Sequence, residues 1–91
     1  MAEAGYRVTG RVQGVGYRWW ARSLAVRLGV SGTVRNLPDG SVAVHVRGAD
    51  DRLRLLATSL AEGPAGAQVT SVDPIPFSPD GISEGEFSIL R

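Results

Sequence analysis

The chain has 91 residues, a length that suits one small domain with one modest hydrophobic core. Its ten basic residues are all arginine and nine acidic residues nearly balance them, so a broad basic surface for nucleic acid is not expected. The lack of lysine excludes Schiff-base chemistry and a P-loop, and the lack of cysteine excludes disulfides, thiol catalysis and cysteine-ligated metals.

The first half of the chain predicts a strand, a helix and a hairpin. Residues 6–13 alternate between apolar and polar side chains, which indicates a strand with one buried face. From residue 17 the apolar spacing becomes helical, and a glycine supplies a stop, so a helix is expected over residues 17–28. Strands at 31–36 and 41–47 flank the Asp39-Gly40 pair, which favours a tight turn.

The second half predicts a helix and two strands. We expect Asp50 to cap a helix that ends near Glu62, followed by strands near residues 68–73 and 86–90. Because each helix has one apolar stripe, both can cover the same face of one sheet. The order is that of an α+β, ferredoxin-like βαββαβ sandwich, an antiparallel sheet with two helices on one face and an extra terminal strand. Residues 1–91 are expected to form this single domain.

The first helix begins without a usual capping side chain. Residues 13–16 precede it, and none of them offers a favoured side-chain acceptor to the free N–H groups of the first turn. An anion there would satisfy these donors, glycines would let the backbone wrap it, and Arg18 would add a fork suited to phosphate. The alternative is that the glycines serve only the turn and that Arg18 lies on a solvated face.

Two stretches carry a resemblance to a known family. Residues 8–18, VTGRVQGVGYR, resemble the first signature of the acylphosphatases, and residues 32–48, GTVRNLPDGSVAVHVRG, resemble the second. The resemblance extends over essentially the whole chain. It implies hydrolysis of the carboxyl–phosphate bond of small acyl phosphates by direct attack of water, giving carboxylate and inorganic phosphate, without a metal, a cofactor or a covalent intermediate.

The resemblance also implies roles for individual residues. Carried over by position, the catalytic residues are Arg18, which would hold the phosphate, and Asn36, which would orient the attacking water. The substrate-binding backbone cradle would consist of Gln13, Gly14, Val15, Gly16 and Tyr17. The chain departs from the family pattern at Tyr17, where phenylalanine is commoner, and at Thr33, where an aromatic residue is usual. Both departures concern packing near the site more than its chemistry.

Two other functions remain as alternatives. A non-catalytic phosphate-binding module could keep the cradle, but it would have no need of a water-positioning amide at Asn36. An RNA-binding domain on the same scaffold would use aromatic residues on the open sheet face, where we expect arginines and His45 but no aromatic pair. We therefore expect a monomeric enzyme with no metal, nucleic-acid or membrane partner. In the absence of a signal or membrane-spanning segment, we expect it in the cytoplasm.

Several other residues have simple structural explanations. His45 falls on the outward phase of its strand, so a surface role is expected, and a lone histidine has no companions for a typical metal site. Asp50 and Asp51 are better explained by helix capping than by metal binding. Trp20 belongs to the core stripe of the first helix, whereas Trp19 falls off it and either packs partly exposed or borders the substrate's acyl group.

Overall fold

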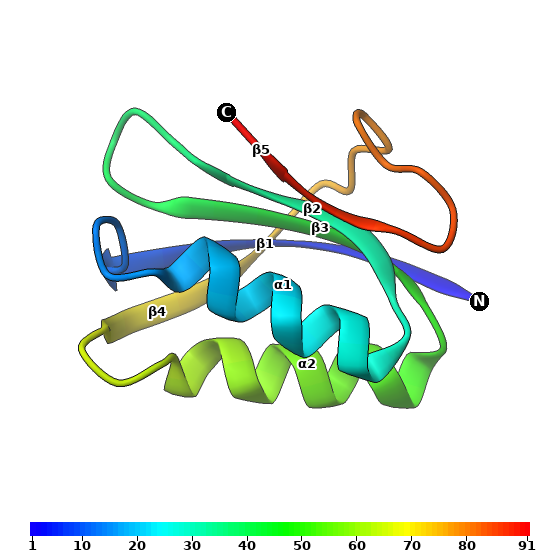
Figure 1. Ribbon diagram of the computed structural model, residues 1–91, viewed down its shortest axis with the longest axis horizontal. Helices are drawn as coiled ribbons and strands as arrows, with labels where there is room; N and C mark the ends of the chain where they lie inside the picture. Colours follow the sequence, from blue (N-terminus) through cyan, green and yellow to red (C-terminus); the bar gives the residue numbers. More distant parts are fainter.

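Five strands form one sheet and two helices cover one of its faces (Figure 1). The computed structural model describes residues 1–91. The strands occur in the order β4-β1-β3-β2-β5 across the sheet. The elements along the chain are β1 (Ala2–Arg11), α1 (Tyr17–Leu28), β2 (Ser31–Asn36), β3 (Val42–Gly48), α2 (Asp50–Glu62), β4 (Gln68–Ile75) and β5 (Phe87–Leu90). The ferredoxin-like α+β fold is confirmed, and neither helix is long and apolar enough to cross a membrane.

One detail of the sheet differs from the expectation. Strands β1, β2, β3 and β4 pair antiparallel, but β5 pairs with β2 in parallel, so the sheet is mixed. The cause is the connection: residues 76–86 cross the sheet face opposite the helices before β5 begins, which brings the chain into β5 from the end at which β2 also starts (Figure 1). The C-terminal end of β5 therefore lies next to the C-terminal end of β2.

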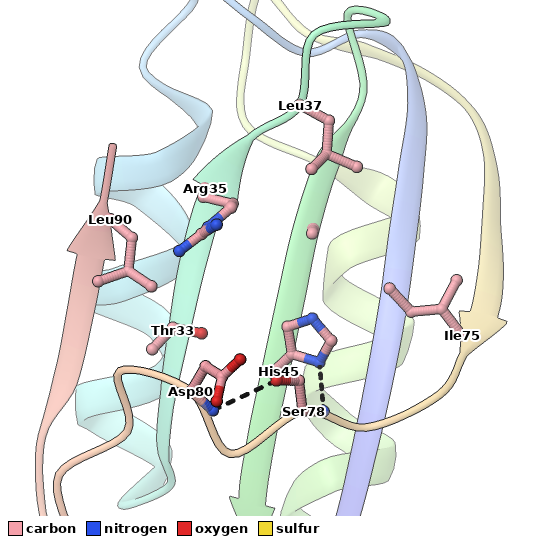
Figure 2. A pocket seen from close by; sticks show the side chains of 9 residues that line it. Thr33, Arg35, Leu37, His45, Ile75, Ser78, Asp80 and Leu90 are labelled. Atoms are coloured by element: carbon pink, nitrogen blue, oxygen red, sulfur yellow. Dashed lines mark hydrogen bonds between the residues drawn. The ribbon is translucent and has the colours of Figure 1, made fainter.

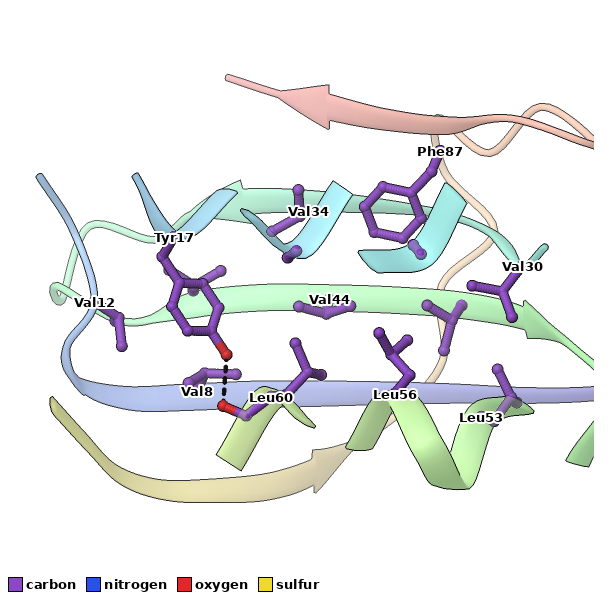
Figure 3. Packing of buried hydrophobic residues seen from close by; sticks show 14 residues of the cluster. Val8, Val12, Tyr17, Val30, Val34, Val44, Leu53, Leu56, Leu60 and Phe87 are labelled. Carbon is purple, nitrogen blue, oxygen red and sulfur yellow. Dashed lines mark hydrogen bonds between the residues drawn. The ribbon is translucent and has the colours of Figure 1, made fainter. Parts of the chain in front are cut away.

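The hydrophobic core lies between the helices and the inner face of the sheet. Fourteen buried residues form one cluster, in which the valines of β1, β2 and β3 meet the leucines of α2 (Figure 3). The sequence alternation that predicted a buried face is followed in β3, where Val42, Val44 and Val46 are inaccessible to solvent. Trp20, expected in the core, is only partly buried and packs its ring 5.2 Å from that of Tyr17.

The two helices begin and end close to the expected residues, but one cap is wrong. Helix α1 ends at Gly29, whose φ of 70° is the left-handed conformation that glycine adopts without strain. Asp50 does not cap α2: the N-cap is Ala49, no side chain bonds to the end, and Asp50 is the first helical residue. Asp50 and Asp51 instead place negative charge in the first turn, where the helix dipole favours it.

Tyr17 joins the two helices through a buried hydrogen bond. Its hydroxyl donates to the carbonyl oxygen of Leu60 at 2.8 Å, and both residues are almost fully buried (Figure 3). The last carbonyls of a helix have no partner within the helix, so this hydroxyl supplies a donor that the last turn of α2 lacks. Burial raises the pKa of Tyr17 far above its usual value, which keeps the hydroxyl protonated as a donor.

The outer sheet face is not fully open. The β4–β5 loop, residues 76–86, is tied to it by two hydrogen bonds: the N–H of Ser78 donates to Nδ1 of His45 at 3.1 Å, and the N–H of Gly85 donates to Oγ of Ser31 at 2.8 Å. Phe77 lies edge-on to His45 and 5.5 Å from the guanidinium of Arg47. His45 therefore points outward as expected, but the loop half-buries it.

We expect Tyr17→Phe to lower the free energy of unfolding by about 1–3 kcal/mol, because the buried carbonyl of Leu60 would lose its donor. Urea denaturation measures this. Tyr6→Phe is the matched control, since the Tyr6 hydroxyl makes no hydrogen bond within the protein, and it should change stability by less than about 0.5 kcal/mol. Equal effects of the two substitutions would contradict the capping role of Tyr17.

We expect the protein to lose stability as the pH falls below about 6.5, the usual pKa of histidine. Burial and then the charge of Arg35 lower the pKa of His45 despite the opposing charge of Asp80, and Arg47 adds a further cation on the same strand. The unfolded chain thus takes up a proton before the folded one, so stability is full above that pH and declines as the pH falls toward the folded pKa.

Urea midpoints taken at intervals from about pH 7.5 to about pH 5 measure this slope. His45 is the only histidine, so His45→Gln should flatten the curve in this window. An unchanged slope in the variant would show that His45 is not the group responsible.

Candidate active site

The loop between β1 and α1 exposes a run of backbone donors. Gly14 and Gly16 have φ angles of 75° and 78°, and α1 starts at Tyr17 with no side-chain cap. No backbone N–H from Gln13 to Trp19 donates a hydrogen bond within the protein. Successive N–H groups in such a turn form a concave anion-binding nest, here at the positive end of a helix dipole. The uncapped start expected from the sequence is confirmed.

Arg18 stands in the first turn of α1 beside this loop. Its guanidinium forms no ion pair and no hydrogen bond with another residue. Together with Trp19, Ile89 and Arg91 it lines a pocket of about 470 Å³. The indole of Trp19 is 65% exposed, so it belongs to the wall of this pocket and not to the core. A free guanidinium next to free N–H groups makes this end of the molecule suited to an anion.

Asn36 reaches the same end of the sheet from β2. It is the last residue of that strand and pairs with Val42, whose side chain points into the core, so Asn36 also projects from the helix-covered face. Its Oδ1 atom is buried and has no hydrogen-bond partner. Nearly all buried polar atoms have a partner, so a lone buried amide oxygen indicates that a donor from outside the chain belongs there.

Gln13 holds the loop to the hairpin that follows Asn36. Its Nε2 donates to the carbonyl oxygens of Leu37 at 2.8 Å and Ser41 at 2.9 Å. Sequence reasoning assigned Gln13 a backbone role only and missed this side-chain function. No local signal could have revealed it, because its partners lie 24 and 28 residues away. The clamp places Asn36, the neighbour of Leu37, beside the loop.

Other polar groups are directed away from this end or already engaged. The hairpin carboxylate, Asp39, accepts hydrogen bonds from the hydroxyl and N–H of Ser41, which lower its pKa, and it pairs with Arg7. His45 projects from the opposite face of the sheet. The terminal carboxylate of Arg91 forms no ion pair with Arg18. No group of three or more His, Asp or Glu side chains is placed to hold a metal ion.

Comparisons with known proteins agree on one family. A family model described as Acylphosphatase matches residues 4–89. An acylphosphatase of Rhizobium etli is 52% identical over 67 residues, which cover 74% of this chain and 71% of that protein. One from Thermotoga maritima is 44% identical over 78 residues, 86% of this chain and 87% of that protein. The crystal structure of acylphosphatase from Bacillus subtilis superposes with a TM-score of 0.89 at 29% identity, covering both chains completely.

We expect Gln13→Ala to lower the free energy of unfolding by about 1–3 kcal/mol, because two carbonyl oxygens would lose their shared donor. Gln13→Glu should destabilise at least as much, since a carboxylate cannot donate to them. Chemical denaturation of both variants beside Gln68→Ala, which removes an exposed glutamine of β4, checks the prediction. A cost no larger than that of the control would show that the clamp is unimportant.

Proposed function

The chain belongs to the acylphosphatase family, and from this premise we propose how its residues hydrolyse acyl phosphates. The family's reaction cleaves the carboxyl–phosphate bond and yields a carboxylate and inorganic phosphate, and this chain is an enzyme of that kind. We propose that the N–H groups of residues 13–17 and the guanidinium of Arg18 bind the phosphoryl group. The observation that carries this assignment is the run of backbone donors without protein partners beside a free guanidinium.

Asn36 is proposed to position the attacking water. Its buried Oδ1 lacks a donor, and a water molecule hydrogen-bonded there would supply one. The clamp of Gln13 holds the adjacent hairpin to the phosphate loop, so water and phosphoryl group would be held by parts of the chain that cannot move independently. Positioning of this kind is a main source of rate enhancement in phosphoryl transfer.

The small number of side chains suits this substrate. The departing carboxylate has a pKa of about 4, by analogy with Asp and Glu side chains, so it needs no proton from the enzyme. The remaining requirement is to stabilise charge on the equatorial phosphate oxygens, which N–H donors and one arginine can do. Because Asp39 is engaged by Ser41 and Arg7, and His45 lies on the other face, we propose that a phosphate oxygen of the substrate accepts the proton of the water.

The assay substrate that tests this site is a synthetic aromatic acyl phosphate, with EDTA present. Arg18→Ala should lower kcat/KM by about two to three orders of magnitude and weaken inhibition by inorganic phosphate, because it removes a charge-stabilising donor. Asn36→Ala should lower kcat while leaving phosphate inhibition nearly unchanged, since it removes only the positioning of water. Arg27→Ala, in the last turn of the same helix, is the control.

Full activity in either site variant would remove that residue from the mechanism. A fall in wild-type activity caused by EDTA would contradict the proposed metal-free reaction. The non-catalytic alternative, a phosphate-binding module, would predict tight phosphate binding without turnover in the wild type. The RNA-binding alternative is disfavoured because the β4–β5 loop covers part of the sheet face that RNA would need. We further propose that residues 1–91 act as one domain, as a monomer and in the cytoplasm.

A further inference from the structure

The outer sheet face carries a second pocket, far from the phosphate loop. It has a volume of about 240 Å³ and lies where the β4–β5 loop crosses β2 and β3 (Figure 2). The two hydrogen bonds of the loop, to His45 and to Ser31, hold it over the sheet on either side of this pocket. Gly81 of the loop packs so closely on Leu90 that an added Cβ would lie 2.9 Å from its Cδ1. The pocket is thus built by long-range contacts and not by a loose surface loop.

Three polar groups face the pocket without partners in the protein. Since Nδ1 of His45 accepts the hydrogen bond from Ser78, the ring proton resides on Nε2, which makes no hydrogen bond within the chain. The guanidinium of Arg35 and the carboxylate of Asp80 also line the pocket, and neither forms an ion pair or a side-chain hydrogen bond. Both charges act on His45, so all three groups lie near one another.

The rest of the lining is apolar. Leu37 comes from the hairpin, Ile75 from the end of β4 and Leu90 from β5, and Figure 2 shows them spaced around the imidazole of His45. Pockets for drug-sized ligands usually measure about 300–1,000 Å³, so this one suits something smaller. The pocket therefore combines one cation, one anion, one neutral donor and a short apolar wall.

We propose that this pocket binds a free α-amino acid with a branched aliphatic side chain. The carboxylate of the amino acid lies on the Arg35 guanidinium and accepts the Nε2 proton of His45, and its ammonium group lies on Asp80. Its side chain contacts Leu37 and Ile75. A simple carboxylate would meet the repulsion of Asp80, and a simple amine would meet that of Arg35, whereas a zwitterion satisfies both charges.

This site is separate from the one proposed for hydrolysis. Arg35 and Asn36 are consecutive residues of β2 and project from opposite faces of the sheet, so an amino acid on Arg35 does not touch the phosphate loop. The inference does not depend on the catalytic assignment, and a binding measurement on the intact protein tests it without any assay of activity.

The experiment compares L-leucine with two analogues that each lack one charge, 4-methylpentanoate and 3-methylbutan-1-amine. Each is titrated to about 10 mM, which covers the millimolar affinity expected of a ligand this small. Amide NMR signals of Ser78 and Asp80 report occupancy of the pocket. Leucine should cause saturable shifts, and each analogue should bind about tenfold or more weakly, because a charge-assisted contact is lost.

Two exposed substitutions assign the contacts. Asp80→Asn should remove the preference for leucine over 4-methylpentanoate, and Arg35→Gln should remove the preference for leucine over the amine. Asp73→Asn, which changes an exposed carboxylate of β4 outside the pocket, should leave binding as in the wild type. The proposal is overturned by the absence of saturable leucine binding, by either analogue binding as tightly as leucine, or by an equal loss of binding in the Asp73→Asn protein.

Discussion

The hydroxyl of Tyr17 donates a buried hydrogen bond to the carbonyl oxygen of Leu60, and the position of the phosphate loop depends on this contact. Tyr17 is the first residue of α1, so its anchored ring fixes where the loop ends, while β1 fixes where the loop begins. Between these two points the backbone is short and carries two left-handed glycines. A loop held in this way loses little further conformational freedom when it binds an anion, which is the advantage of preorganisation.

The proposed active site divides its work between main chain and side chains. Backbone donors are numerous, are fixed by the fold and cannot be lost by a change of side chain, so they suit the task of binding a phosphoryl group. Side chains then act singly: Arg18 supplies charge, Asn36 supplies an acceptor for water, and Gln13 joins their two supports. Such an arrangement is sufficient only because the bond to be broken already has a good leaving group.

Local sequence patterns predicted most of the elements. The helix at residues 17–28 and the strand at 31–36 have the expected bounds, because apolar periodicity and glycine stops act over neighbouring residues. The cap at Asp50 was wrong because an aspartate one position further along can serve the helix dipole without capping. The parallel pairing of β5, the clamp of Gln13 and the cover over His45 all join residues distant in the chain, so periodicity held no information about them.

The path of the sheet also decides what can be attached to either end of the chain. Ala2 pairs with Gly48 at the end of β1 away from the phosphate loop, and Figure 1 shows the N-terminus far from the start of α1. Arg91, in contrast, lines the same pocket as Arg18. An affinity tag or a fusion partner joined ahead of Met1 would therefore leave the mouth of that pocket clear, whereas one joined after Arg91 would emerge directly beside it.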